Sequence, residues 1–347
     1  YLPLGLELVG RYLAEDPDLS LAKMLQALKT KRLQNRAINP SEEELQSTEM
    51  TAKLGVKAAF DLSWQKLDAL TQRVGELLSL FAPDVIPWEL VESASKKMNW
   101  VDDDVNEAKK QLYKYHLIQR LDDSIAIYKI HPLVREFLIE QLAENSNYKP
   151  EMQLGNEENL KQSFVTTILS IAKEIPQNLN LKYINYFRFI IPHLAEIAEN
   201  LLDVVDDEDL YFVFYSLGAF YQGQGLYVLA EPWSNQCVLK TQARLGSEHR
   251  DVAASINNLA ELYRSQGRYN EAEPLYVKAL ELFKCLFGYE HRDVARSINN
   301  LAALYYLQGR YSNAESLYIE ALELSKHLLG WEHRDVARSI SNLASLY

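Results

Sequence analysis

The sequence is poor in the residues that mark loop-rich, disulfide-rich or membrane-spanning proteins. Its 347 residues include only 13 glycines, 11 prolines and two cysteines, Cys237 and Cys285. Two cysteines cannot form a disulfide framework, so we expect a cytoplasmic protein. No run of about 18 apolar residues occurs, so we expect no membrane-spanning helix and no membrane partner. The low glycine content and the 21 tyrosines favour a mainly α-helical chain with aromatic packing.

Signatures of phosphate chemistry are also missing. No G-x-x-x-x-G-K-S/T loop occurs, and no hydrophobic strand ends in paired aspartates that would hold magnesium. We therefore expect this chain to have no enzyme activity, no catalytic residues and no cofactor of its own.

The net charge of −12 is concentrated in one part of the chain. Residues 211–347 contain 13 basic and 14 acidic residues, which leaves 23 basic and 34 acidic residues in residues 1–210. Nucleic-acid binding depends on many contacts between basic side chains and phosphates. An acidic first part therefore argues against a nucleic-acid partner.

A repeated pattern with a period of about 42 residues fills the last third of the chain. It is clearest in the glycines that follow a glutamine and in the histidines. These are Gly225, Gly267 and Gly309, and His249, His291 and His333. The unit begins at Asp251 and at Asp293, restarts at Asp335, and has a degenerate copy from about Leu210. Residues 210–347 thus hold three copies and one helix of a fourth.

Each copy predicts two antiparallel helices. Apolar residues recur with the spacing of one helical face at Ile256, Leu259, Ala260 and Tyr263, and again at Ala272, Leu275, Tyr276, Ala279 and Leu280. Gly267 and Gly288 are expected to end these helices. Neither hairpin can bury its apolar face alone, so the copies are expected to stack into an α-solenoid.

The repeated unit resembles the tetratricopeptide repeat. The motifs N-N-L-A-x-L-Y and G-x-E-H, together with the length of the period, are similar to the kinesin-light-chain subtype. The match covers about 40% of the chain. Arginine stands at positions 250, 292 and 334, where that subtype usually has proline.

The face of the solenoid opposite its core is the predicted binding face. Helical geometry places eight residues there: Asn257, Asn258, Glu261, Arg296, Asn299, Asn300, Arg338 and Asn342. Asparagine and arginine side chains suit the amides and carboxylates of a peptide, and tetratricopeptide proteins commonly bind extended peptides in this groove. An alternative is that the asparagines cap or bridge neighbouring helices and the arginines are solvated.

The three repeated histidines raise the question of a metal site. They lie one per repeat, which is too far apart for one ion with bonds of about 2 Å. We expect them to cap or pack the turns between helices, and we expect no metal site. Cys237 aligns with Ala279 and Ala321, which predicts a buried small residue and not a nucleophile.

The front of the chain divides into three segments. We expect a helical segment over residues 1–50, a winged-helix-like domain over 51–145, and a linker with a helical spacer over 146–209. Within the second segment, helical patterns are followed by two β-like runs, Leu117–Leu121 and Ile125–Ile130, and by a last helix from Pro132. Longer helices are expected near 160–175 and 181–202.

Two short motifs in this front part resemble NB-ARC/STAND signalling ATPases. L-P-L at residues 2–4 is similar to the segment whose proline packs against adenine, and here that proline is Pro3. Ile130-His131-Pro132 resembles the M-H-D segment, whose histidine reaches the β-phosphate of ADP. Ile130 and Pro132 depart from that pattern. The alternative for each motif is a purely local role: Pro3 starts a helix, and His131 closes a strand before one.

The resemblance implies that this chain is the C-terminal part of a longer bacterial protein. ADP or ATP would bind an upstream nucleotide-binding domain, with Pro3 and His131 beside it only in the full-length parent, a slow ATPase switch. The winged helix would restrain that switch, and a ligand on the repeats would favour an open, oligomerising state.

Two other functions compete with this sensor interpretation. One is a plain adaptor scaffold, in which the repeats only tether protein partners. The other is a DNA-binding regulator that uses Lys109, Lys110 and Lys114, but the acidic residues of 102–107 precede these lysines and would repel phosphate.

Overall fold

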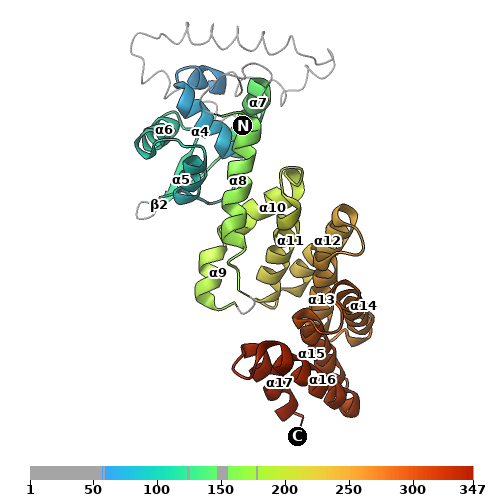
Figure 1. Cartoon of the computed structure of the whole chain (residues 1–347). Helices are drawn as coiled ribbons and strands as arrows, with labels where there is room; N and C mark the ends of the chain where they lie inside the picture. The colour runs from blue at the N-terminus through green and yellow to red at the C-terminus, as the bar shows by residue number, and fades with distance from the viewer. Residues whose placement is uncertain (1–56, 58, 123–125, 147–154, 177–178, 347) are drawn as a thin grey trace, which may run out of the picture. The chain divides into compact units, whose positions relative to one another are not determined.

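A computed structural model describes residues 57, 59–122, 126–146, 155–176 and 179–346 (Figure 1). The chain forms two compact units, the first ending at Ile168 and the second beginning at Leu169. The division falls inside α8 (Glu157–Ala172), within the segment that the sequence predicts as linker and spacer. The helical segment expected over residues 1–50, with Pro3, lies outside the described residues.

The first unit is helical apart from a small sheet. A helix over 59–64 ends in a turn before α4 (Ala69–Ser79), whose first turn is capped where the Thr71 amide donates to Asp68 Oδ1 at 2.8 Å. The following elements are β1 (Ile86–Pro87), α5 (Trp88–Lys97), α6 (Asp102–Lys114), β2 (Gln119–Asp122), β3 (Ile127–Lys129) and α7 (Pro132–Ser146). Two helices, a hairpin and a final helix therefore follow one another in the order expected for a winged helix.

The sheet has three antiparallel strands in the order β1-β3-β2. The hairpin of β2 and β3 was expected, whereas β1 was not. Only Ile86 and Pro87 belong to β1, paired with Tyr128 and Ile127, and two residues cannot show the alternation that identifies a strand. Pro87 lacks an N–H, and it fits here because β1 is an edge strand.

Large aromatic side chains form the core of the first unit. Phe81 contacts Phe164 with ring centroids 4.7 Å apart, and Trp88 contacts Tyr128 at 5.4 Å. The start of α8 belongs to this unit, since Leu160, Phe164 and Ile168 are completely buried.

The second unit is entirely helical in its described part. Its elements are α9 (Leu181–Phe187), α10 (Ile191–Asn200), α11 (Asp207–Gln222), α12 (Tyr227–Leu245), α13 (Arg250–Ser265), α14 (Tyr269–Phe287), α15 (Arg292–Leu307), α16 (Tyr311–Leu329) and α17 (Arg334–Ala344). The single helix expected over 181–202 is wrong: α9 ends at Phe187 and α10 starts at Ile191, with Pro192 in its first turn. Proline lacks the N–H and clashes with the carbonyl four residues earlier, so the helix cannot continue through it.

The predicted helix pairs of the solenoid are confirmed. They are α11 with α12, α13 with α14, and α15 with α16, followed by α17 (Figure 1). Gly267 and Gly309 have φ of +75° and follow the first helices, which is the conformation that the glycine signal predicts. Ala260, Ala272 and Ala279 are fully buried, and these small residues let adjacent helices approach closely.

The Q-G-R-Y motif links consecutive copies. Arg268 donates to Glu231 of the preceding copy at 2.8 Å and stacks on Tyr263 at 4.0 Å. Arg310 repeats the arrangement with Glu273 and Tyr305, at 2.8 and 3.8 Å. The motif therefore joins each turn to its neighbour.

No helix in the described ranges is long and apolar enough to cross a membrane.

Candidate functional site

All eight predicted binding residues line one groove of about 540 Å³ on the repeats. The groove follows the first helices of successive copies, α11, α13, α15 and α17, with contributions from α12. The structure thus brings together Asn257, Asn258, Glu261, Arg296, Asn299, Asn300, Arg338 and Asn342. Their role in binding a peptide stays a prediction.

The asparagines form a ladder between copies. Asn300 Nδ2 donates to Asn257 Oδ1 at 3.3 Å, and Asn342 Nδ2 donates to Asn299 Oδ1 at 3.1 Å. In the first step the acceptor is a tyrosine, because Asn258 Nδ2 donates to the Tyr211 hydroxyl at 2.6 Å. The asparagines therefore do bridge neighbouring helices. Each amide nitrogen carries two N–H groups and the ladder uses one, so bridging and ligand binding are compatible.

Each arginine of the groove is held by a carboxylate one helical turn earlier. Arg296 lies 3.2 Å from Asp293, and Arg338 lies 2.9 Å from Asp335. Arg264 pairs with Glu261 in the same way. A guanidinium has five N–H groups in a fixed plane, so one carboxylate orients it and leaves further donors for a ligand.

Glu261 has a second partner inside the solenoid. The buried Tyr276 donates its hydroxyl proton to Glu261 Oε2 at 2.6 Å. Burial raises the pKa of Tyr276 well above its ordinary value, and the neighbouring Glu261 carboxylate acts in the same direction. The phenol therefore stays protonated and fixes Glu261 at the wall of the groove.

One end of the groove is aromatic, which the sequence analysis missed. Tyr211 and Tyr215 stack with ring centroids 5.1 Å apart, and both line the groove beside Tyr227 and Ala219. A signal was available, because Tyr215 lies one repeat period before Asn257, and Ala219 lies one period before Glu261. Applying the groove positions to the degenerate copy would have identified this end.

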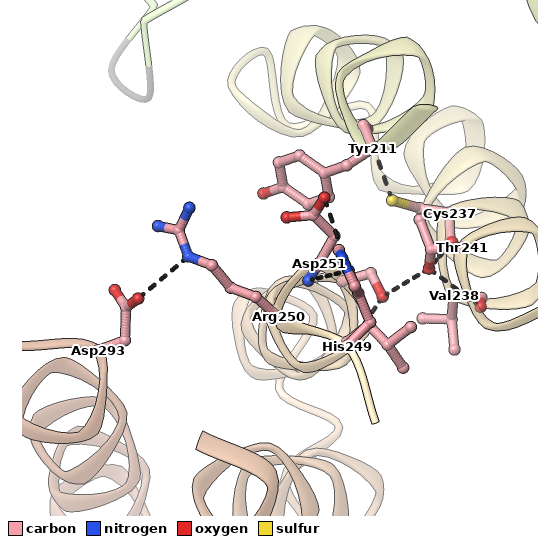
Figure 2. A network of polar contacts seen from close by, with 10 residues as sticks. Tyr211, Cys237, Val238, Thr241, His249, Arg250, Asp251 and Asp293 are labelled. Atoms are coloured by element: carbon pink, nitrogen blue, oxygen red, sulfur yellow. Dashed lines mark hydrogen bonds and ion pairs between the residues drawn. The ribbon is translucent and has the colours of Figure 1, made fainter. Parts of the chain in front are cut away.

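The repeated histidines cap helices, as predicted. The Nδ1 atoms of His249, His291 and His333 accept the amide N–H two residues later at 3.1, 3.2 and 3.1 Å. The predicted burial of Cys237 is also confirmed, since it is 3% exposed, its thiol lies 3.8 Å from the Tyr211 carbonyl oxygen, and burial raises its pKa (Figure 2). No cluster of three or more His, Cys, Asp or Glu that could hold a metal occurs in the part of the chain that the structure covers.

His131 occupies the junction between β3 and α7. Its Nδ1 accepts the Leu133 amide N–H at 3.2 Å, the same capping geometry as in the repeats. Partial burial lowers the pKa of His131, and the Lys129 cation adds to this effect. The proton of the neutral ring therefore resides on Nε2, which is the donor that a phosphate oxygen would require. The local role of closing the strand and starting the helix is present in either case.

The lysines of α6 are engaged with neighbours on their own unit. Lys109 lies 5.1 Å above the Trp88 ring, and burial lowers its pKa. Lys110 pairs with Glu107 at 3.0 Å, and Lys114 lies 5.4 Å above the Tyr115 ring. These arrangements do not form a surface of unpaired cations suited to a phosphate backbone.

Family models match three parts of the chain. Residues 210–284 and 294–335 match tetratricopeptide repeat models, and residues 62–147 match a domain of unknown function, DUF7779. The matching models do not include an NB-ARC domain. A comparison with curated proteins gave no match.

Solved structures with similar helical repeats include three of note. BtubC (BKLC) from P. vanneervenii is 23% identical, with a TM-score of 0.44 and coverage of 60% of this chain and 78% of that one. The kinesin-light-chain-type repeats from Podospora anserina are 22% identical, with a TM-score of 0.43 and coverage of 54% and 86%.

The third structure is a STAND protein with a tetratricopeptide repeat sensor from Pyrococcus horikoshii. It is 12% identical, with a TM-score of 0.40, and the match covers 99% of this chain but 63% of that one. This chain therefore spans less than two thirds of the STAND protein. The direct family matches, together with the helix pairs, show that this chain carries tetratricopeptide repeats stacked in a solenoid, a scaffold of the kind that serves protein interaction.

Proposed function

We propose that the groove of the repeats binds an extended segment of a protein partner. The observation that carries this proposal is the common position of eight asparagine, arginine and glutamate residues in a groove of about 540 Å³. A polar groove of this kind suits a ligand that presents many backbone amides and carbonyls.

The ladder gives the groove a repeated hydrogen-bonding pattern. Asn257 and Asn299 are 7% and 5% exposed and are fixed by their partners, Asn300 and Asn342. An amide side chain offers both a donor and an acceptor, as a peptide bond does. Fixed amides lose little conformational entropy on binding, which favours affinity for an extended backbone.

The test uses a library of random peptides displayed to the intact chain. Arg296→Ala combined with Asn299→Ala removes one arginine and one ladder asparagine, and we expect it to lose most of the peptides that the unmodified chain selects. Arg292→Ala combined with Asn313→Ala removes the same residue types from exposed positions outside the groove, and should keep those peptides. An unchanged selection in the first variant would leave only the bridging role for these residues.

The finer proposal is that the repeats are the sensor of a signal-transduction ATPase, and that the first unit restrains its nucleotide switch. Its support is the winged-helix order of α5, α6, the β2–β3 hairpin and α7, with His131 at the end of the wing. ADP or ATP would bind to an upstream nucleotide-binding domain of the parent protein. Ligand binding would shift the switch only if the two states bind the ligand with different affinity.

Two variants of His131 separate the nucleotide role from the cap. Asparagine keeps an acceptor for the Leu133 amide but removes the imidazole, whereas alanine removes both. In the full-length parent, the nucleotide role predicts faster ADP release in both His131→Asn and His131→Ala. Unchanged ADP release in both variants would favour the plain adaptor scaffold.

A further inference from the structure

Four aspartates occupy equivalent places in the first turns of successive repeat helices. Asp209, Asp251, Asp293 and Asp335 follow one another at intervals of one repeat period and lie in α11, α13, α15 and α17. Because the local backbone is repeated, the ion pairs of the four aspartates can be compared with one another. A difference in their ion pairs therefore reflects a difference in their neighbours.

Three of these aspartates have a lysine or arginine partner. Asp293 lies 3.3 Å from Arg250 and 3.2 Å from Arg296, and Asp335 lies 2.9 Å from Arg338. Asp209 is paired with Lys173. These contacts neutralise carboxylates that are partly withdrawn from water.

Asp251 is the exception. Its neighbour in the next turn is Ala254, where the two later copies have Arg296 and Arg338. Arg250, directly before it, extends away to Asp293 of the following copy (Figure 2). Within the described ranges, Asp251 makes no ion pair with a lysine or arginine.

The neighbouring histidine does not replace the missing cation. His249 Nδ1 lies 3.9 Å from the Asp251 carboxylate, but this nitrogen accepts the Asp251 amide N–H and therefore presents its lone pair (Figure 2). The Asp251 side chain is 19% exposed, and burial raises its pKa, while the charges of His249 and Arg250 act in the opposite direction. A partly buried carboxylate of this kind gains from a cation that reaches it.

The place left by the missing arginine opens into the groove. Ala254 lines the groove together with the stacked rings of Tyr211 and Tyr215. The short alanine side chain leaves space one helical turn from Asp251, which is the separation that Arg296 spans to reach Asp293. The aromatic rings add faces that attract a cation.

The preceding copy shows that a cation from a different segment can occupy this place. Lys173 lies outside the repeats, pairs with Asp209, and lies 5.5 Å above the ring of Phe212. Phe212 is the counterpart of Ala254 in the preceding copy. A lysine supplied by another segment thus takes the position that an arginine of the repeat holds in later copies.

We propose that the groove beside Asp251 and Ala254 binds a lysine or arginine side chain of the ligand segment, which supplies the cation that this copy lacks. This inference rests on the proposed peptide-binding function and specifies its ligand. The bound cation would pair with Asp251 and lie near Tyr211 and Tyr215, while Arg264 stays paired with Glu261. The selected segment therefore has a basic residue at a fixed position, at the end of the groove nearest α11.

The experiment selects peptides from a random displayed library with the intact chain. We expect lysine or arginine to be enriched at one fixed position. A selected peptide and its copy with methionine at that position are then titrated against the protein, and we expect a loss of about tenfold in affinity, as for one charge-assisted pair.

Three variants test the contact itself. Ala254→Arg would pair with Asp251 as Arg296 pairs with Asp293, so the tenfold preference for the basic peptide should disappear. Asp251→Asn should reduce the preference in the same way. Ala254→Met adds similar length without charge, and it should weaken both peptides equally while the preference remains.

The outcomes separate this inference from the proposed function. Peptides selected without a basic preference, or a preference that survives in both Ala254→Arg and Asp251→Asn, would overturn the inference and leave the groove proposal intact. Loss of the preference in Ala254→Met would show that the volume at position 254, and not its charge, determines the preference for the basic peptide. That result would also overturn the inference. No selection of any peptide would overturn the proposed function, and this inference with it.

Discussion

The two units of the chain build their interiors differently. The first unit gathers large aromatic side chains into one core, with Phe81 and Phe164 in contact and both fully buried. The repeats instead bury small alanines, such as Ala260 of α13 and Ala279 of α14, in a cluster that also contains the aromatic residues Tyr276 and Phe283. A substitution in a single core destabilises all the elements that share the core. In a solenoid, it destabilises mainly the neighbouring copies.

The largest expected effect comes from removing one aromatic side chain from each interior. Phe81→Ala deletes a fully buried ring from the first unit and should lower its free energy of unfolding by about 3–5 kcal/mol. Because that unit has one core, we expect its whole unfolding transition to move. Calorimetry combined with hydrogen exchange on the intact chain measures the two units separately.

Phe283→Ala is the matched change in the repeats, since Phe283 is 1% exposed. We expect a similar loss, of about 3–5 kcal/mol, but confined to α13–α16 in hydrogen exchange. Equal loss of protection from α11 to α17 would contradict the picture of nearest-neighbour coupling. Retained protection of α4–α7 in Phe81→Ala would contradict the single core.

Replacing a glycine by alanine is expected to destabilise the two units for different physical reasons. A Cβ at Gly75 in α4 would lie 2.7 Å from the Trp64 ring, so Gly75→Ala should cost about 1–3 kcal/mol through crowding. Gly267 faces open space but has φ of +75°, so Gly267→Ala should cost about 1–2 kcal/mol through backbone strain. Denaturant unfolding measures both costs.

Further substitutions at or near these two glycines distinguish crowding from backbone strain as the cause of the lost stability. Trp64→Phe should recover part of the stability lost in Gly75→Ala, because the smaller ring makes room. Gly267→Asn should cost less than Gly267→Ala, because asparagine tolerates the left-handed region. If Gly267→Asn and Gly267→Ala are equally destabilised, backbone conformation is not the reason for that glycine.

The same contrast explains how far the sequence could predict the structure. In the repeats, each position has counterparts one period away. The same glycine signal therefore recurs at Gly267 and Gly309, and the ends of the helices can be predicted from it. In the first unit, β1 contains only Ile86 and Pro87, and its pairing with Tyr128 and Ile127 is set by tertiary contacts that no local pattern records. The break at Pro192 was readable from the proline, but the apolar spacing on both sides suggested a continuous helix.

For the candidate site, helical geometry was sufficient to predict which residues share the groove. It placed Asn299 and Arg296 on one face with their counterparts, and the structure brings them together. From the sequence, bridging by the asparagines was only one of two alternatives, because the hydrogen bond from Asn300 to Asn257 depends on the spacing between copies. The ion pair between Arg250 and Asp293 crosses copies in the same way.

The smallest expected effect concerns the histidine cap of the first unit. Burial lowers the pKa of His131 in the folded state, so the unfolded chain binds a proton more readily than the folded one. The stability contributed by the neutral ring is complete above the unfolded pKa of about 6.5 and is lost as the pH falls through the lower folded pKa. The melting temperature of the first unit should therefore decrease slightly below about pH 6.5.

His131→Asn keeps an acceptor for the Leu133 amide but cannot titrate in this range, so its melting temperature should change less over the same interval. Parallel pH curves for the two proteins would show that protonation of His131 does not weaken the cap.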